Sequence, residues 1–513
     1  MSAIKSYNEA IEKLNTLDSN FTFREKFKTC DKSTLIPEML EWCRLCGYDR
    51  TDFDRFNAIH ITGSKGKGST AAFVFSILSQ YLPKSSKEEN AAIKKLGLYT
   101  SPHLLSVRER IRIRESGEVP MAQTPISEEK FAKRFFEIWE RLGMEKKPPH
   151  EGPPFFKFLT LTAFHTFLEE AVDTAIVEVG IGGEYDSTNV LHRPSVCAIT
   201  SLGLDHTDML GETIEEIAWM KGGIMKEGCP AFTVPQPEGA LAVLKERAAE
   251  KNAVLKVVPI HPDIESMRLG LAGDFQKVNA SLAAAVAAAH LRSMGYPDIP
   301  DDITSAPLPE KFRKGLMEAV WPGRCETHKA LGVTWCLDGA HTVESIGVLG
   351  TWFAEKIRAN MSSERILIFN QQTRNALPLL HQLRRSICDS AGLTGNQAPF
   401  THVIFCTNIP WAADTTFSAE HASMNHSGKS PEDLQVQNEL ARIWKDIEGE
   451  EHTRVTVVRS VEEAIRCVRS LHPAVADGMD SQGQTSGSQS PISLITGSLH
   501  LVGSAMEVLD TLV

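Results

Sequence analysis

The stretch Ile59-His60-Ile61-Thr62-Gly63-Ser64-Lys65-Gly66-Lys67-Gly68-Ser69-Thr70 joins an apolar run to a glycine-rich turn. The apolar run predicts a buried strand, and the residues from Gly68 onward predict the beginning of a helix. Glycines in the turn allow backbone angles that other residues resist, so amide N–H groups can approach an anion. The helix N-terminus adds positive potential at the same point. The stretch therefore predicts a phosphate loop in an α/β fold.

A nucleotide at this loop would contact the turn and the first turn of the helix. The residues expected to bind it are Gly63, Ser64, Lys65, Gly66, Lys67, Gly68, Ser69 and Thr70. Lys67 would neutralise the β- and γ-phosphates, and Ser69 or Thr70 could reach phosphate or Mg²⁺. The strict Walker pattern does not hold, because Gly68 separates Lys67 from the hydroxyl residue. The alternative is a glycine-rich connection that binds no ligand.

Strands alternate with helices along the first half of the chain. Strands are predicted at 56–62, 174–179, 196–201 and 231–234, and helices at 127–142, 158–170, 213–220, 239–250 and 277–291. Short apolar strands separated by helices are typical of a parallel sheet whose two faces are covered. The predicted fold class is therefore α/β with a mostly parallel sheet.

A segment rich in Pro and Asp at 296–309 interrupts this alternation, and we interpret it as a linker. Beyond it, strands predicted at 333–337, 366–369, 402–406, 455–458 and 492–496 alternate with helices at 343–357, 378–390, 439–444 and 461–471, and a final helix follows. The sequence thus predicts an N-terminal domain at 1–295 and a C-terminal domain at 310–513. The segments 83–90, 414–431 and 476–491 have the polar composition of mobile loops, without a role that the sequence indicates.

The charge balance disfavours several partners. The chain of 513 residues has 54 Lys and Arg against 65 Asp and Glu, a net charge of −11. Such a chain is a poor candidate for binding nucleic acid or anionic membranes, and no apolar run is long enough to predict a membrane-spanning helix. Ten thinly spread cysteines indicate a reducing compartment. Because the N-terminus has no signal-peptide pattern, we expect a cytoplasmic protein, with a mitochondrial form from an upstream start left open.

Several stretches together resemble the folylpolyglutamate synthase family of the Mur-ligase superfamily. They are Gly63–Ser69, Leu98–Leu104, Phe158–Phe164, Val177–Gly183 with Asp186–Asn189, Ser201–His206, Ile217–Ile224, Trp321–Arg324, Leu337–Thr342 and Thr496–Gly503. The resemblance implies a P-loop ATPase domain followed by a smaller Rossmann-like domain, with the active site between them. The segment Gly270–Gln276 departs from the family pattern, because Phe275 stands where the family has His.

The resemblance implies a ligase that adds L-glutamate to the γ-carboxylate of folate polyglutamates through an acyl phosphate. ATP is then a co-substrate and Mg²⁺ a cofactor, and a monovalent cation such as K⁺ is compatible with the family. We expect a monomer. The alternatives are a dihydrofolate synthase, a bifunctional enzyme of both activities, or, from another class, a P-loop switch protein without a second substrate.

The metal ligands implied by the resemblance are Ser101, Glu178 and His206. The sequence itself singles out Glu178, since a carboxylate in the run Ala175–Gly180 is costly unless it is paired or bound to a metal. Carboxylate and hydroxyl oxygens suit Mg²⁺. Outside this motif set, Glu178 would be a buried ion-pair partner, Ser101 a turn residue and His206 a helix cap.

The remaining site residues are also carried over by motif. Lys67, Lys221 and His341 are the expected catalytic residues, and Lys221 matches a lysine that is carbamylated in relatives. Arg324 and Asp338 are expected to bind ATP from the second domain. The expected substrate residues are Thr100, His103, Asp186 and Ser498, and the loop Gly182–Val190 matches a mobile loop of the family.

Overall fold

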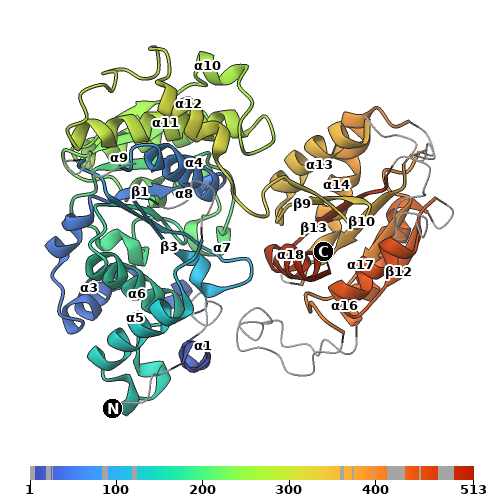
Figure 1. Ribbon diagram of the computed structural model, residues 1–513, viewed down its shortest axis with the longest axis horizontal. Coiled ribbons are helices and arrows are strands. Elements are labelled where there is room, and N and C mark those ends of the chain that lie inside the picture. The colour runs from blue at the N-terminus through green and yellow to red at the C-terminus, as the bar shows by residue number, and fades with distance from the viewer. Residues whose placement is uncertain are drawn as a thin grey trace. The chain divides into compact units, whose positions relative to one another are not determined.

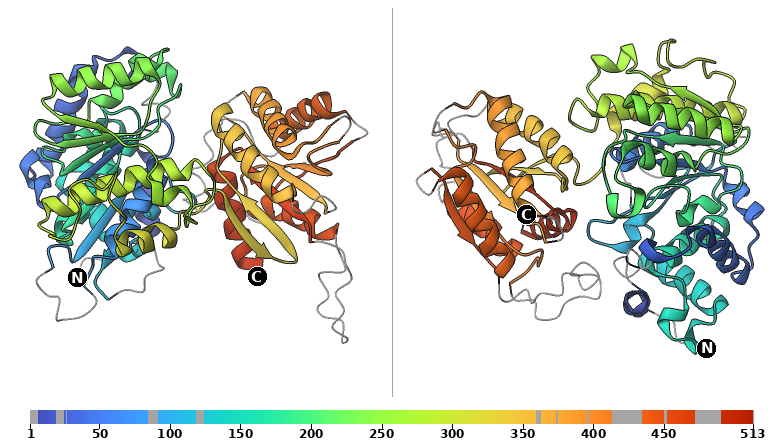
Figure 2. Two further views of the ribbon diagram at one scale, coloured as in Figure 1. Left: turned by 90° about the horizontal axis from the view of Figure 1, so that it is seen from above. Right: turned by 180° about the vertical axis from the view of Figure 1, so that it is seen from behind.

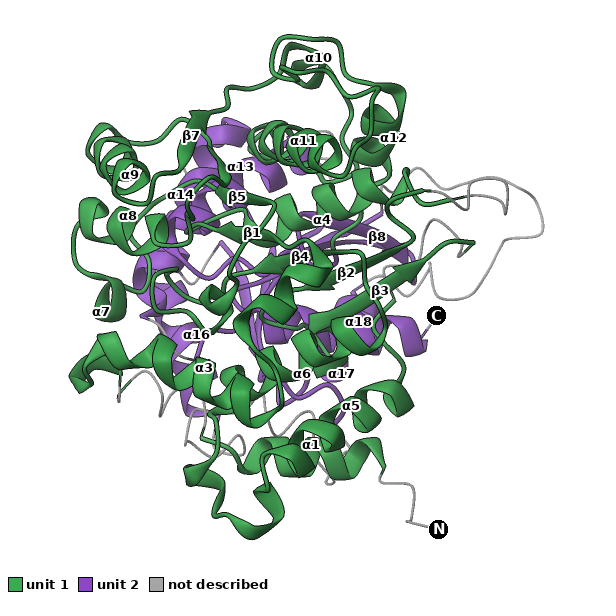
Figure 3. Cartoon of the chain, turned by 90° about the vertical axis from the view of Figure 1, so that its left-hand side faces the viewer, with its two compact units in different colours: residues 1–321 green, residues 322–513 purple. Residues whose placement is uncertain are grey.

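The structure of the chain is a computed structural model that forms two compact units, Met1–Trp321 and Pro322–Val513 (Figure 3). The residues described are 6–18, 25, 27–83, 91–117, 124–358, 363–372, 375–394, 397–412, 434–449, 452–471 and 490–512. Of the loops predicted at 83–90, 414–431 and 476–491, all but residues 83, 490 and 491 lie outside the described residues.

The first unit is built on a sheet that, in the described part of the chain, has seven strands in the order β3-β2-β4-β1-β5-β6-β7 (Figure 1). The strands are β1 (Ile59–Thr62), β2 (Lys95–Tyr99), β3 (Ile111–Glu115), β4 (Thr174–Glu178), β5 (Val196–Ile199), β6 (Pro230–Thr233) and β7 (Val254–Val257). All neighbours pair in parallel except β2 and β3. The mostly parallel α/β sheet predicted from the sequence is confirmed.

Helices cover both faces of this sheet. In the described part of the unit the α-helices are α1 (Tyr7–Thr16), α3 (Leu35–Leu45), α4 (Lys67–Ser79), α5 (Glu128–Arg141), α6 (Phe155–Glu169), α7 (Thr207–Leu210), α8 (Ile214–Gly222), α9 (Glu238–Glu250), α10 (Pro262–Glu265), α11 (Gln276–Ser293) and α12 (Glu310–Glu318). Short 3₁₀ helices are η1 (Lys32–Thr34), η2 (Arg50–Phe56), η4 (Val107–Arg110), η5 (Met144–Lys146), η6 (Pro149–Glu151) and η7 (Ser187–Val190).

Side-chain alternation along the strands assigns helices to each face. Val196 and Ala198 of β5 pack in the core that α4, α11 and α12 share, whereas Cys197 and Ile199 pack with α8 and α9. Helix α6 lies on the second face too, because Phe167 of this helix abuts Gly97 of β2. Right-handed crossovers between parallel strands explain this division. Connections that lead to a strand on one side in the sheet order cross one face, and connections that lead to the opposite side cross the other face.

The boundary between the units lies later than the sequence predicts. Helix α12 belongs to the first unit, because its Phe312 and Leu316 are buried in the core formed with α4. At Gly315 the two helices approach so closely that Ser76 Oγ donates a hydrogen bond of 2.6 Å to the Gly315 carbonyl. The Pro- and Asp-rich segment at 296–309 is therefore a connection within the first unit, and the break follows Trp321.

The second unit has its own sheet, which in the described residues has six strands in the order β12-β11-β10-β13-β9-β8 (Figure 2). The strands are β8 (Glu326–Ala330), β9 (Val333–Leu337), β10 (Arg365–Phe369), β11 (His402–Phe405), β12 (Arg454–Val457) and β13 (Ile492–Thr496), and the helices are α13 (Val343–Arg358), α14 (Ala376–Ala391), α16 (Gln435–Glu448), α17 (Val461–Ser470) and α18 (Leu499–Leu512). Only β8 pairs antiparallel, with β9. This arrangement agrees with the predicted second α/β domain.

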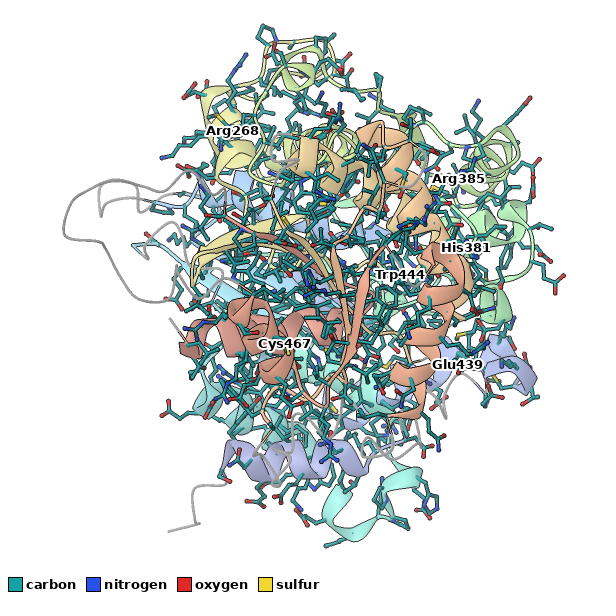
Figure 4. The ribbon with its side chains drawn as sticks, turned by 90° about the vertical axis from the view of Figure 1, so that its right-hand side faces the viewer. Arg268, His381, Arg385, Glu439, Trp444 and Cys467 are labelled. Carbon is teal, nitrogen blue, oxygen red and sulfur yellow. The ribbon has the colours of Figure 1, made fainter. Side chains whose placement is uncertain are left out.

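Helix α16 illustrates how the apolar stripe of a helix decides its packing in this unit. Leu440 and Trp444, four residues apart, lie on one face of the helix and are buried, whereas Glu439 is exposed on its outer side (Figure 4). Residues four apart lie one above the other on a helix, so this pair forms the contact face. None of the helices in the described ranges is long and apolar enough to cross a bilayer.

Two buried histidines are expected to make the first unit sensitive to acid. His60 and His290 are fully buried, and burial lowers the pKa of each imidazole from 6.5 to about 3. Between these values the unfolded chain binds protons that the folded chain excludes, so stability falls as the pH drops below about 6.5. At about pH 5.5 each histidine should lower the free energy of unfolding by about 1.4 kcal/mol.

Denaturant unfolding of the wild type and of His290→Gln, at about pH 7.5 and about pH 5.5, measures this effect. The variant should lose less stability on acidification than the wild type does. His150→Gln, at an exposed position, is the matched control and should show the wild-type loss. An equal loss of stability in all three proteins would contradict the assignment.

Candidate active site

The carboxyl ends of four neighbouring strands meet at one edge of the first sheet. In the parallel register Ile61 of β1 lies beside Glu178 of β4, and Thr62 lies beside Ile199 of β5. Tyr99 of β2 lies beside Val177 of β4. The phosphate loop after β1 therefore shares this edge with Glu178, with Thr100 and Ser101 after β2, and with the loop after β5. Ligands of open α/β sheets bind at this edge.

The phosphate loop is shaped by two glycines and by contacts with the loop after β5. Gly63 and Gly66 have φ angles of +149° and +89°, and a Cβ atom at either residue would collide with the Thr200 hydroxyl or with the Asn279 amide, respectively. The N–H groups of Ser64 and Lys65 donate to the Ser201 carbonyl, at 3.0 and 3.1 Å. The loop therefore directs the first turn of α4, whose first three N–H groups have no intrahelical acceptors, toward the ligand edge.

The hydroxyls of the first turn of α4 lie beside polar side chains of α11. Gln276 Nε2 donates to Ser69 Oγ at 3.2 Å, and Asn279 Nδ2 donates to Gln276 Oε1 at 2.9 Å. Thr70 Oγ1 is buried and has no hydrogen-bond partner among the described residues. An orphaned hydroxyl in a phosphate loop is a group that a bound ligand can satisfy.

Two lysines converge on the Gly63 carbonyl. Lys67 Nζ of α4 and Lys221 Nζ of α8 each donate to this oxygen at 2.9 Å. Lys221 is buried, and its pKa lies well below the ordinary lysine value because of burial and then because of the nearby Lys67 charge. The structure thus brings both expected catalytic lysines of the first unit to the base of the phosphate loop.

Glu178 is a buried carboxylate at the end of β4. It is 4% exposed, and its Oε2 accepts the Ser101 N–H at 3.0 Å. His206 lies on the loop after β5, where it precedes α7, and its Nε2 is 4.0 Å from Asp205 Oδ1. In the described residues no three His, Cys, Asp or Glu side chains gather as a metal cage. The carboxylate of Glu178 and the hydroxyl of Ser101 nevertheless fit Mg²⁺, which prefers oxygen ligands and takes few of them from the protein.

Asp186 orders the loop Gly182–Val190, in which it caps η7. Its Oδ1 accepts from Thr188 N–H at 3.0 Å and from Thr188 Oγ1 at 2.6 Å, and its Oδ2 accepts from Ile181 N–H at 3.0 Å. Burial raises the pKa of the Asp186 carboxyl, and the hydrogen bonds from Thr188 oppose this effect. Because loop donors hold both oxygens, the structure gives this expected substrate residue an internal role.

Strand β1 holds the same loop through two side chains that sequence reasoning missed. Thr188 donates its hydroxyl proton to Asp186, so it accepts the N–H of His60 Nε2, at 2.8 Å. Two residues further along β1, Thr62 Oγ1 donates to the Gly182 carbonyl at 2.6 Å. Residues two apart on a strand face the same side. The strand that presents the phosphate loop thereby also fixes the loop Gly182–Val190.

The other residues of the first unit that were expected to contact substrate lie at the end of β2. Thr100 is buried, and its N–H donates to the Arg110 carbonyl at 3.0 Å. His103 accepts a hydrogen bond at Nδ1 from Arg110 Nε, at 2.9 Å. The imidazole therefore carries its proton on Nε2. Sequence reasoning did not single out Arg110, because it stands in the charged run 108–115, where Arg is ordinarily a surface residue.

The candidate residues of the second unit gather at the carboxyl end of its sheet. Asp338 follows β9, and its carboxylate accepts the N–H groups of Cys325 and Ala340 at 2.7 and 2.8 Å. Burial raises the pKa of Asp338, and the nearby Arg324 charge opposes this shift. The carboxylate thus fixes the turn that carries Arg324.

His341 and Ser498 lie near this turn. His341 Nδ1–H donates to the Gly339 carbonyl at 2.7 Å, and Ser498 Oγ accepts the His500 N–H at 3.2 Å. The Gly497 N–H donates to the Ala340 carbonyl at 3.2 Å, which joins the two segments. Sequence reasoning missed a buried amide network beside them, formed by Asn370, Asn408 and Gln437, and also Gln371, whose Nε2 donates to the Gly497 carbonyl at 2.8 Å.

Comparisons with known proteins point to one family. Residues 324–508 match the family model described as the C-terminal domain of dihydrofolate synthetase. A folylpolyglutamate synthase of Saccharomyces cerevisiae is 44% identical over 520 aligned residues, which cover 99% of this chain and 87% of that protein.

Solved structures give the same fold. The folylpolyglutamate synthase of Mycobacterium tuberculosis complexed with ADP superposes with a TM-score of 0.67 at 21% identity, over 98% of this chain and 99% of that one. The enzyme of Thermotoga maritima gives a TM-score of 0.64 at 24% identity, over 93% of both chains. From the identity along nearly its whole length, the chain belongs to the folylpolyglutamate synthase family.

Proposed function

We propose that this chain is an ATP-dependent ligase that adds L-glutamate to the γ-carboxylate of reduced folates and of their polyglutamates. The observation that carries the proposal is the family membership along 99% of the chain. The phosphate loop, Glu178 and both lysines at one sheet edge give it a physical basis. A carboxylate is a poor electrophile, and transfer of the ATP γ-phosphoryl group to its oxygen converts that oxygen into a leaving group. The glutamate amine then forms the amide bond, and phosphate leaves with the carboxylate oxygen.

The chain's own residues would position the reactants and balance charge. Lys67 and the first turn of α4 would hold the β- and γ-phosphates, as in other phosphoryl-transfer sites. Glu178 and Ser101 would hold Mg²⁺, which when bound neutralises the charge that develops on the phosphates. His206 adds a ligand that the family resemblance supports.

Lys221 has the environment that carbamylation requires. A buried amine with a lowered pKa is uncharged in part, and an uncharged amine is the form that reacts with CO₂. We propose this modification on the family resemblance and on that burial. Mass spectrometry after trapping of the carbamate tests it.

Arg324 is proposed to bind the nucleotide phosphates from the second unit, through a planar fork suited to phosphate oxygens. Replacing it by alanine is expected to raise the KM for ATP by about 10-fold or more, while the affinity for folate stays unchanged. Initial rates at varied ATP, together with folate binding measured by fluorescence, check this. An unchanged KM for ATP would rule out the phosphate contact. Arg442→Ala, on the exposed side of α16, is the control.

His341 and Ser498 are proposed to hold the incoming L-glutamate. Asp338 is proposed to bind the nucleotide and, through its hydrogen bonds to the backbone, to position Arg324. The monomeric state, a cytoplasmic location and a contribution of K⁺ are further proposals, which rest on the sequence. Sedimentation, cell fractionation and replacement of K⁺ by tetramethylammonium test them in turn.

An assay with two acceptors tests the proposed reaction. Purified protein receives ATP, labelled L-glutamate and either tetrahydrofolate or dihydropteroate, and ADP and labelled product are measured. We expect product with tetrahydrofolate. Product with dihydropteroate alone would identify a dihydrofolate synthase, and ATP hydrolysis independent of both substrates would favour a switch protein.

A further inference from the structure

Arg110 lies at the ligand edge of the first sheet, at the end of η4. Its carbonyl accepts the Thr100 N–H, and the residue after it, Ile111, pairs with Tyr99 at the end of β2. Thr100, which the family resemblance links to substrate, therefore lies directly opposite Arg110, and Ser101, which the resemblance links to the metal, follows it. Arg110 therefore lies at the edge of the sheet that carries the candidate site, and not at the opposite edge.

The guanidinium of Arg110 is buried and forms no ion pair with a carboxylate of the described residues, although the charges of Glu178 and Glu109 lie near enough to oppose the lowering of its pKa by burial. The residue is 4% exposed, its Nε donates to His103 Nδ1, and its guanidinium lies 5.7 Å from the centre of the Phe155 ring. In the described ranges neither of its terminal nitrogens has a hydrogen-bond or ion-pair partner. The carboxylate of the adjacent Glu109 is held by three backbone N–H groups, those of Leu104, Leu105 and Ser106.

Two other buried arginines of this unit, Arg134 and Arg247, are paired with carboxylates. Arg134 contacts the carboxylates of Glu137 and Glu170, and Arg247 contacts those of Glu184 and Glu250. A buried cation is costly unless an anion compensates it. Burial lowers the pKa of Arg110, because the charged guanidinium is removed from water. A guanidinium left with two unpaired donor groups at a ligand edge is suited to an anion that arrives with the substrate, and its planar fork matches a carboxylate.

The position in the sheet indicates which substrate brings this anion. The phosphate loop follows β1, and β4 lies between β1 and β2. Neighbouring strands are about 4.8 Å apart, so the end of β2 lies about 10 Å from the strand that presents the phosphates. A cation there can bind the acceptor while the reacting carboxylate faces the phosphate. The terminal glutamyl unit of a folate has two carboxylates, and only the γ-carboxylate reacts.

We propose that Arg110 binds the α-carboxylate of the terminal glutamyl unit of the folate acceptor. The proposal rests on the ligase function proposed above. Arg110 is then a binding residue for the acceptor, held in place by His103 and Phe155. It contributes to the selection of acceptors that end in a glutamyl unit.

Paired changes in protein and substrate test the contact. Wild type, Arg110→Gln and Arg110→Lys are assayed with tetrahydrofolate and with its analogue in which the glutamyl α-carboxylate is a primary amide. Loss of charge-assisted hydrogen bonds should raise the KM for tetrahydrofolate by roughly 10-fold or more in Arg110→Gln, with the KM values for ATP and L-glutamate unchanged. In the wild type, the KM for the amide analogue should exceed that for tetrahydrofolate by a similar factor. Arg110→Gln should raise the KM for the analogue little further.

Arg108→Gln is the matched control, because Arg108 lies in the same 3₁₀ helix and its guanidinium donates to the Ile126 carbonyl and pairs with Glu128. It should keep the wild-type KM for tetrahydrofolate. A shift in the KM for L-glutamate instead would place the contact on the incoming amino acid and overturn the proposal. The proposal would also be overturned if replacing tetrahydrofolate by the amide analogue raised the KM by the same factor in the wild type and in Arg110→Gln.

The wild type alone gives a second test that does not depend on the folding of a variant. If it ligates tetrahydrofolate and the amide analogue with equal KM, the Arg110 contact is excluded while the ligase function stands. If it ligates glutamate to no folate, the proposed function fails, and the Arg110 contact fails with it.

Discussion

Lys67→Ala is expected to lower the turnover number by about 100- to 1000-fold while the protein stays folded. The side chain donates one hydrogen bond, to the Gly63 carbonyl at 2.9 Å, and it contributes to no apolar core. Loss of that bond costs about 1 kcal/mol of stability, whereas loss of the charge removes stabilisation of the phosphates in the transition state. The turnover number at saturating substrates and the midpoint of thermal unfolding measure the two effects separately.

Lys245→Ala is the matched control, since this lysine is exposed on α9. It should retain wild-type turnover. A Lys67→Ala variant with wild-type turnover would contradict the phosphate contact. Collapse of its thermal stability in the absence of ATP would show that Lys67 acts mainly on the fold.

Glu178→Gln should lower the turnover number by about 100-fold or more and should weaken the apparent affinity for Mg²⁺. The substitution keeps the size of the side chain, and the glutamine carbonyl can still accept the Ser101 N–H. It removes the negative charge that the metal requires. Activity measured over a Mg²⁺ titration checks both effects.

The control for this change is Glu246→Gln, on the exposed face of α9. Its Mg²⁺ titration should match that of the wild type. If Glu178→Gln shows the wild-type Mg²⁺ dependence with a lower rate, then Glu178 positions the loop at Ser101 and does not bind the metal.

Four central strands of the first sheet were predictable because they are buried on both faces, whereas β2 (Lys95–Tyr99) was not predicted although it is buried too. The stretches that form β1, β4, β5 and β6 are short apolar runs, and such runs leave a clear signal in the sequence. Strand β3 (Ile111–Glu115) was not predicted, because its alternating arginines are typical of an exposed segment. The edge strands β7 and β8 were also missed: neither has a buried residue, and β8 lacks an apolar run.

The position of the domain boundary shows that the composition of a segment can predict a loop but cannot predict the domain to which that segment belongs. The segment 296–309 has the Pro and Asp content of a linker, yet Ile299, Ile303 and Leu308 are buried in the core of the first unit. A few well-placed apolar side chains are enough to fix a segment of otherwise polar composition.

The site was predictable where one residue type permits one chemistry, as at Gly63, Gly66 and Lys67. It was not predictable where function depends on pairing across the fold. Thr188 is 128 residues away from His60 in sequence, and no local pattern indicates their hydrogen bond. Asp186 was expected to contact substrate, and only the structure shows that its oxygens hold the loop Gly182–Val190. Arg110 became distinctive only through its burial and its missing partner.

The most direct test of the proposed chemistry follows one oxygen atom. Tetrahydrofolate labelled with ¹⁸O in its γ-carboxylate is incubated with the protein, ATP and L-glutamate, and the released phosphate is analysed by ³¹P NMR. Ligation through an acyl phosphate transfers one labelled oxygen to each phosphate, because the carboxylate oxygen leaves with the phosphoryl group. Unlabelled phosphate, released in step with the amide product, would contradict activation of the folate by ATP.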